Sequence, residues 1–185
     1  MSPGLPALVV TGPPASGKST LGGILARHLG AVLLDQDVVT RPLTAVVAGL
    51  LGTDDLDSAD LAGATRRARY ETLLAIAADN LALGRPVVLV APFTDERRRP
   101  VAWQRLADRL ADAGGHAVLV WLRLSPEQLL VRMRERAAAR DRAKLADMHG
   151  YLARVDLQPP VVEHLAVDAS DDLAAQAHRV LAWLS

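Results

Sequence analysis

The stretch Gly12-Pro13-Pro14-Ala15-Ser16-Gly17-Lys18-Ser19 fits the pattern G-x-x-x-x-G-K-[ST] at every position. Residues 5–11, just before it, are apolar and rich in valine, as is typical of a buried parallel strand. Residues 20–29, just after it, carry leucine and isoleucine at helical spacing. Strand, glycine loop and helix in this order are the context in which the pattern forms a cradle for phosphate groups.

The residue types of this loop suit phosphate chemistry. Gly12 and Gly17 permit backbone angles that a side chain would penalise, so loop N–H groups can turn inward. The following helix N-terminus adds partial positive charge. Lys18 can reach the β- and γ-phosphates, and the Ser19 hydroxyl can ligate Mg²⁺. The flanking elements disfavour a chance match, so we expect ATP and Mg²⁺ to bind at Gly12, Pro13, Pro14, Ala15, Ser16, Gly17, Lys18, Ser19 and Thr20.

Length and composition narrow the class of protein. The chain has 185 residues, half of them hydrophobic, which fits one domain covering 1–185. No apolar run approaches the ~20 residues of a membrane span, and the short N-terminus leaves no room for a signal peptide. Cysteine is absent, which excludes disulfides and thiolate sites. We expect a cytoplasmic protein, and the zero net charge argues against a broad nucleic-acid surface.

Apolar runs alternate with helical patterns along the whole chain. Strands are expected at 5–11, 31–34, 86–91, 116–122 and 165–167, and helices at 20–29, 43–51, 59–83, 94–113, from 126 onward, and from about 171 to 184. This alternation predicts an α/β fold: a three-layer P-loop NTPase with a five-stranded parallel sheet flanked by helices. Ligands in such folds lie beyond the carboxyl ends of the strands.

Two aspartates end the second expected strand. Asp37 can accept the proton of an attacking hydroxyl or hold that hydroxyl in line, and Asp35 is a weaker candidate for the same role. Either carboxylate can also orient Mg²⁺-bound water. The alternative is an Asp pair in an ordinary turn, or Asp35 acting as a helix cap.

An arginine-rich stretch at 132–144 follows the fourth expected strand. Arg132, Arg136 and Arg140 are spaced by four residues and would share one helix face. Guanidinium groups on a mobile lid, about 134–146, could stabilise the charge of a transferring phosphoryl group and exclude water. We favour Arg136 and Arg140 for this role; the alternative is a solvated charged helix.

The third expected strand, 87–91, contains no acidic residue, so metal binding is expected to depend on Ser19, the phosphates, water and Asp37. Beyond this strand, Thr94, Asp95 and Arg98 are candidate substrate contacts, although a capping pair and a solvated arginine explain them equally well. Arg41 is a further candidate, for an acidic group of the substrate.

The loop, the Asp-x-Asp pair, the arginine-rich stretch and Val167-Asp168-Ala169-Ser170 together resemble small P-loop kinases. The chain looks most like the gluconate kinase and shikimate kinase group within the nucleoside-monophosphate-kinase-like fold, and is also similar to zeta-toxin and chloramphenicol phosphotransferase proteins. The resemblance implies that Asp37 is the base and Asp35 lies near the metal, that Arg136 and Arg140 are lid arginines, and that Ala169 and Ser170 border the adenine.

The resulting hypothesis is an ATP-dependent kinase that phosphorylates a hydroxyl of a small molecule: a sugar, a sugar acid or a natural product. Pro92-Phe93-Thr94-Asp95 stands where shikimate kinases have a glycine-rich substrate loop, so the acceptor is left open. The alternatives are a nucleotide or polynucleotide 5′-kinase and an ATP-dependent switch protein without transfer activity. A homodimer is also left open, because the apolar helix at 59–83 suits a core or a dimer face.

Overall fold

The structure, a computed structural model, describes residues 4–53, 58–136 and 145–184. Five parallel strands form one sheet in the order β2-β3-β1-β4-β5. Their bounds are β1 Leu5–Thr11, β2 Val32–Asp35, β3 Val87–Val90, β4 Gly115–Arg123 and β5 Leu165–Asp168. The predicted fold class is confirmed.

The central strand β1 is buried on both faces. Alternate β1 residues enter different cores, because successive side chains of a strand point to opposite faces. Leu8 and Val10 belong to one apolar cluster, and Ala7 and Val9 belong to the other. An uninterrupted apolar strand is therefore what a sheet between two helical layers requires.

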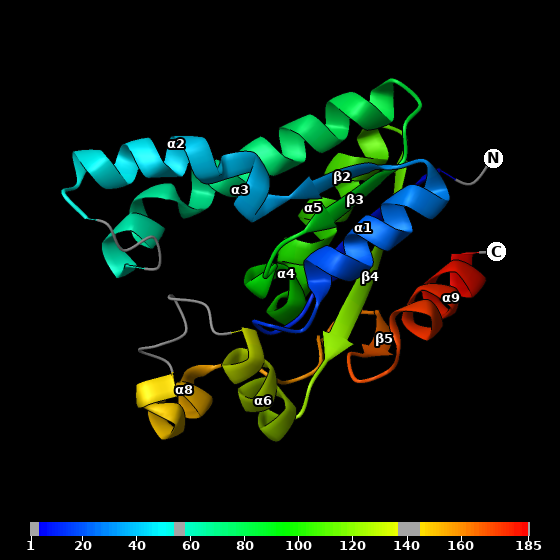
Figure 1. Cartoon of the computed structure of the whole chain (residues 1–185). Helices are drawn as coiled ribbons and strands as arrows, with labels where there is room; N and C mark the ends of the chain where they lie inside the picture. Colours follow the sequence, from blue (N-terminus) through cyan, green and yellow to red (C-terminus); the bar gives the residue numbers. More distant parts are fainter. Residues whose placement is uncertain (1–3, 54–57, 137–144, 185) are drawn as a thin grey trace.

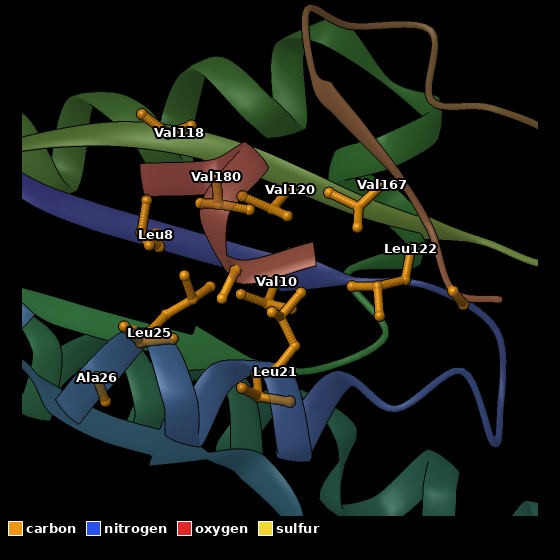
Figure 2. Packing of buried hydrophobic residues seen from close by; sticks show 14 of the residues in the cluster. Leu8, Val10, Leu21, Leu25, Ala26, Val118, Val120, Leu122, Val167 and Val180 are labelled. Carbon is orange, nitrogen blue, oxygen red and sulfur yellow. The ribbon is translucent and has the colours of Figure 1, made fainter. Parts of the chain in front are cut away.

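Helices cover both faces of the sheet (Figure 1). On one face, α1 (Lys18–Leu29) and α9 (Leu173–Leu184) contribute apolar side chains to the cluster seen in Figure 2. On the other face, α3 (Ala59–Ala82) and α5 (Pro100–Asp112) contribute leucines to the second cluster. The sheet is thus packed between two helical layers, and the loops that follow its strands lie at its carboxyl edge.

Helix α2 (Gln36–Leu50) begins seven residues earlier than the sequence predicted, directly at the end of β2. Asp35 is its N-cap, and the Asp35 side chain accepts a hydrogen bond from the backbone N–H of Asp37. The sequence analysis left a turn or a helix cap open for this Asp pair, and the structure shows the cap, which starts the helix here. Helices α2 and α3 pack against each other and extend together beyond the edge of the sheet (Figure 1).

The single helix predicted at 94–113 is two helices, α4 (Thr94–Arg98) and α5. Arg99 between them has an extended backbone, with φ −128° and ψ 110°. Pro100 explains the break, because a proline disfavours helical angles in the residue before it while suiting the first position of a new helix.

Two further helices of the described residues are α6 (Pro126–Arg136) and α8 (Met148–Arg154). Most of the predicted lid, including Arg140, lies outside the described residues. In the ranges that are described, no helix has the length and apolar character to cross a membrane.

Candidate active site

A cavity of about 870 Å³ opens at the carboxyl ends of β1, β2 and β3. Its lining comes from the phosphate loop and α1, from the β2–α2 junction, from the end of β3, and from α3 and α6. The lining residues are Gly12, Pro14, Ala15, Gly17, Lys18, Ser19, Thr20, Asp35, Gln36, Asp37, Arg69, Val90, Ala91, Pro92, Arg132, Glu135 and Arg136. The cavity thus unites most of the residues that the sequence singled out.

The loop 12–19 has the backbone shape of a phosphate cradle. Gly17 precedes α1 with φ 90°, no side chain caps that helix, and its first residues, 18–20, line the cavity. At Gly12, with φ 151°, an added Cβ would lie 2.7 Å from the carbonyl oxygen of Leu122. Glycine is therefore required at Gly12 by both backbone angle and space.

Lys18 is folded back onto this loop. Its Nζ donates hydrogen bonds to the carbonyl oxygens of Gly12, at 3.0 Å, and Pro13, at 2.7 Å. Burial lowers the pKa of Lys18 to about 8, against the opposing attraction of Asp37 and Asp35, while Arg136 lowers it further. The ammonium is thus held in a poorly solvated place where a phosphate would be a better partner than two carbonyls.

Asp35 connects the second strand to the phosphate loop. It is buried, and its Oδ2 accepts a hydrogen bond of 2.5 Å from the Ser19 hydroxyl. Its Oδ1 accepts the N–H of Asp37 at 3.0 Å. The hydroxyl and the carboxylate are both hard oxygen donors of the kind Mg²⁺ prefers, and Mg²⁺ usually takes its remaining ligands from phosphates and water.

Asp37 lies in the first turn of α2 and remains largely exposed to the cavity, with 58% of its side chain accessible. Arg69 of α3 holds it through an ion pair of 2.7 Å. The Arg69 Nε also donates to the Thr40 hydroxyl at 2.9 Å, which fixes the guanidinium between α3 and α2. Sequence reasoning missed Arg69, because the charge lies 32 residues from its partner and no local pattern marks it.

Arg132 and Arg136 approach the cavity from α6. Arg132 donates to the carbonyl oxygens of Ser16, at 3.4 Å, and of Ala169. It therefore links the phosphate loop to the loop after β5, a role that the sequence analysis did not assign. Arg136 is exposed and lines the cavity.

The other candidate residues that the structure describes do not line this cavity. Thr94 and Asp95 line a second cavity of about 330 Å³ between α3 and α4. Arg98 pairs with Asp156, and Arg41 is exposed on α2. Ala169 is buried, and Ser170 bonds to Asp168 through both its N–H and its hydroxyl.

A phosphate loop at the end of β1, two aspartates at the end of β2 and arginines from the flanking helices define a P-loop protein of the kinase type. The AAA domain family model (AAA_33) matches residues 8–157, and the chain belongs to this family.

Solved structures share this fold along nearly the whole chain. A candidate kinase from Chloroflexus aurantiacus is 26% identical, with a TM-score of 0.67 and coverage of 98% of this chain and 97% of its own. A gluconokinase from Sinorhizobium meliloti is 22% identical, with a TM-score of 0.62 and coverage of 98% and 93%. A shikimate kinase from Aquifex aeolicus is 16% identical, with a TM-score of 0.53 and coverage of 96% and 95%. The predicted likeness to the gluconate and shikimate kinase group is confirmed at the level of the fold.

Two curated relatives are cytidylate kinases. The protein from Methylobacterium is 38% identical over 114 residues, which are 60% of this chain and 51% of that protein. The protein from Herpetosiphon aurantiacus is 42% identical over 72 residues, which are 39% of this chain and 31% of that protein. The chain thus matches about half or less of the length of these relatives.

Proposed function

We propose that this protein is an ATP-dependent phosphotransferase that moves the γ-phosphate of Mg-ATP to a hydroxyl of a small molecule. One observation carries the proposal: the Asp37 carboxylate and the phosphate loop line the same cavity. A carboxylate in the same cavity as the phosphate loop can accept the proton of a hydroxyl that attacks the γ-phosphate.

The proposed roles follow from the position of each side chain. Lys18 exchanges its two carbonyl contacts for phosphate oxygens and stabilises the negative charge that spreads over them. Asp37 accepts the proton of the acceptor hydroxyl as its oxygen attacks phosphorus, and Arg69 holds that carboxylate in place. Arg136, and with it Arg140, would neutralise charge on the γ-phosphate from the α6 side.

Mg²⁺ fits the donors at the edge of the loop. Ser19 and Asp35, already joined by a hydrogen bond, would hold the ion directly or through water, with the ATP phosphates as further ligands. When bound, Mg²⁺ neutralises phosphate charge and orients the β- and γ-phosphates. The sequence analysis assigned Asp37 to the metal and, from the resemblance, placed Asp35 near it; Asp35 is proposed here for the metal and Asp37 only as the base.

The test is a transfer assay with pooled hydroxyl compounds: sugars, sugar acids, nucleosides and aminoglycosides. Mass spectrometry after incubation with Mg-ATP should show one added phosphoryl group on at least one compound. The Lys18→Ala protein should form none of this product, since it lacks the phosphate clamp. If Lys18→Ala formed the same product in equal yield, the phosphate loop would not take part in the transfer.

A nucleotide acceptor is the second candidate, and the two cytidylate kinase relatives favour it. In that case the acceptor is a phosphate oxygen of a nucleoside monophosphate instead of a hydroxyl. Arg69, which lines the cavity, would contact the negative charge of that phosphate. Including CMP, UMP, AMP and GMP in the same assay separates the two candidates, because a diphosphate product appears only for a nucleotide kinase.

A further inference from the structure

Gln36 lines the cavity and has no part in the roles described above. It lies between Asp35 and Asp37, begins α2, and is 4% exposed. Within the described parts of the chain, its amide nitrogen Nε2 is fully enclosed and has no hydrogen-bond partner. The residue nevertheless lines the cavity.

An unpaired buried amide is unusual, because native proteins satisfy the large majority of their buried polar groups. The neighbouring carboxylates do not serve it. Asp35 is engaged by Ser19 and by the N–H of Asp37, and Asp37 is engaged by Arg69. A leucine or methionine would fill the same space without leaving a donor unsatisfied. An unpaired donor on a residue that lines the cavity is therefore a candidate contact for a bound ligand.

We infer that Gln36 determines acceptor specificity: its Nε2 donates a hydrogen bond to an oxygen of the bound acceptor. This inference rests on the proposed function and narrows its substrate class. The acceptor carries a second oxygen close to the hydroxyl that reacts at Asp37, as polyols, sugars, hydroxy acids and nucleosides do. Simple apolar alcohols, which leave the amide unpaired, are excluded, because a site built to hydrogen-bond a group rejects the analogue that lacks it.

Gln176 provides a matched control for the first measurement. It is also a glutamine of the buried core, at 3% exposure, but its Nε2 donates to the carbonyl oxygens of Ala169, at 3.3 Å, and Asp171, at 2.7 Å, and only its Oε1 lacks a partner within the described residues. Gln36→Leu should leave the melting temperature within about 1 °C of wild type or raise it, whereas Gln176→Leu should lower it by several degrees. An equal loss of melting temperature in both variants would show that the Gln36 amide has a partner within the protein, and it would overturn the inference.

The second measurement tests the ligand. With MgADP bound, D-gluconate, D-glucose and cytidine serve as oxygen-rich probes, and 1-hexanol serves as the apolar alcohol. At least one oxygen-rich probe should raise the melting temperature of wild type clearly more than that of Gln36→Leu, and 1-hexanol should raise neither. Equal shifts in both proteins, or no shift from any oxygen-rich probe, would overturn the inference.

Kinetics then separate this inference from the proposed function. With an acceptor from the transfer assay, Gln36→Leu should lose about 10-fold in kcat/KM, mainly through KM, and lose little with the analogue that lacks the second oxygen. The same loss with both acceptors would contradict the assignment of Gln36. Failure of every compound to accept phosphate would count against the proposed function instead, while the melting temperatures still decide the state of the Gln36 amide.

Discussion

Lys18 titrates close to physiological pH, since burial lowers its pKa to about 8 in the free protein. Below this value the side chain is an ammonium that attracts phosphates. As the pH rises through about 8 the free protein loses that proton, and ATP must bind a neutral amine or pay for its reprotonation. Affinity for Mg-ATP should therefore fall above pH 8, by at most about tenfold per pH unit.

Calorimetric titration with Mg-ATP between about pH 7 and pH 9 measures this dependence. The Lys18→Arg protein is the control, because its guanidinium stays charged over that range and should bind with a flat profile. Equal profiles for the two proteins would contradict a lowered pKa at Lys18.

Asp37 is the residue on which proton transfer is proposed to depend. Asp37→Asn keeps the size of the side chain and removes its basicity, so kcat for transfer should fall by about 10²-fold or more. The affinity for ATP should change little, because Asp37 belongs to α2 and not to the phosphate loop. Asp112→Asn, at the end of α5, is the matched control and should retain activity. Retention of full transfer by Asp37→Asn would exclude Asp37 as the base.

Residues of the site differ in how far the sequence could indicate them. The phosphate loop follows from a short pattern with two glycines and a lysine, and Asp37 follows from its place beyond a strand. The pattern indicated Arg132 as part of the arginine-rich stretch, but neither its contacts nor Arg69 could be found in this way. The partners of Arg69 and Arg132 lie 32 and 37 residues away, so only the packing of α3 on α2, and of α6 near β5, brings the charges together.

At the level of elements, α4 holds the chain that returns from the lid region toward β5. Arg97 and Arg98 of α4 both bind the carboxylate of Asp156, and Arg98 also donates to the carbonyl oxygens of Gln158 and Pro159 at 3.1 Å. The backbone N–H of Val161 binds the Arg97 carbonyl at 2.9 Å. This cluster fixes one end of the segment that carries the predicted lid.

Asp156→Asn should destabilise the protein by about 2 kcal/mol, because the buried Arg97 then loses its charged partner. The hydrogen bond from Arg98 holds the pKa of Asp156 below its ordinary value. Its contribution to stability is thus present above about pH 4 and is lost as the pH falls toward the lowered pKa of the folded state.

Chemical denaturation at pH 7 and at pH 3 measures both effects. The difference between wild type and Asp156→Asn should be large at pH 7 and should shrink at pH 3. Asp108→Asn on the exposed side of α5 is the control, with a small effect at either pH. A difference between wild type and Asp156→Asn that grows on acidification would contradict this account of the cluster.

The elements themselves follow from the sequence to different degrees. Strands and long helices could be predicted because apolar periodicity is local. The start of α2 was predicted too late, since Asp35 caps a helix where a turn was equally consistent with the pattern. The break at Arg99 was missed, although Pro100 was a visible signal for it.

For the whole molecule, the central claim is transfer of phosphate and not its hydrolysis. The sheet order places β2 next to β3 and β3 next to β1, and the aspartates after β2 and the phosphate loop after β1 line one cavity. A kinase and a nucleotide-dependent switch both bind ATP in such a loop, and they differ in where the γ-phosphate goes.

The most direct test uses ATP labelled with ¹⁸O in the γ-phosphate, together with the compounds of the transfer assay. The account predicts that mass spectrometry finds the labelled phosphoryl group on an acceptor, in a reaction that requires both Lys18 and Asp37. Label found only in inorganic phosphate, whichever acceptor is offered, would contradict it and establish a hydrolysing switch.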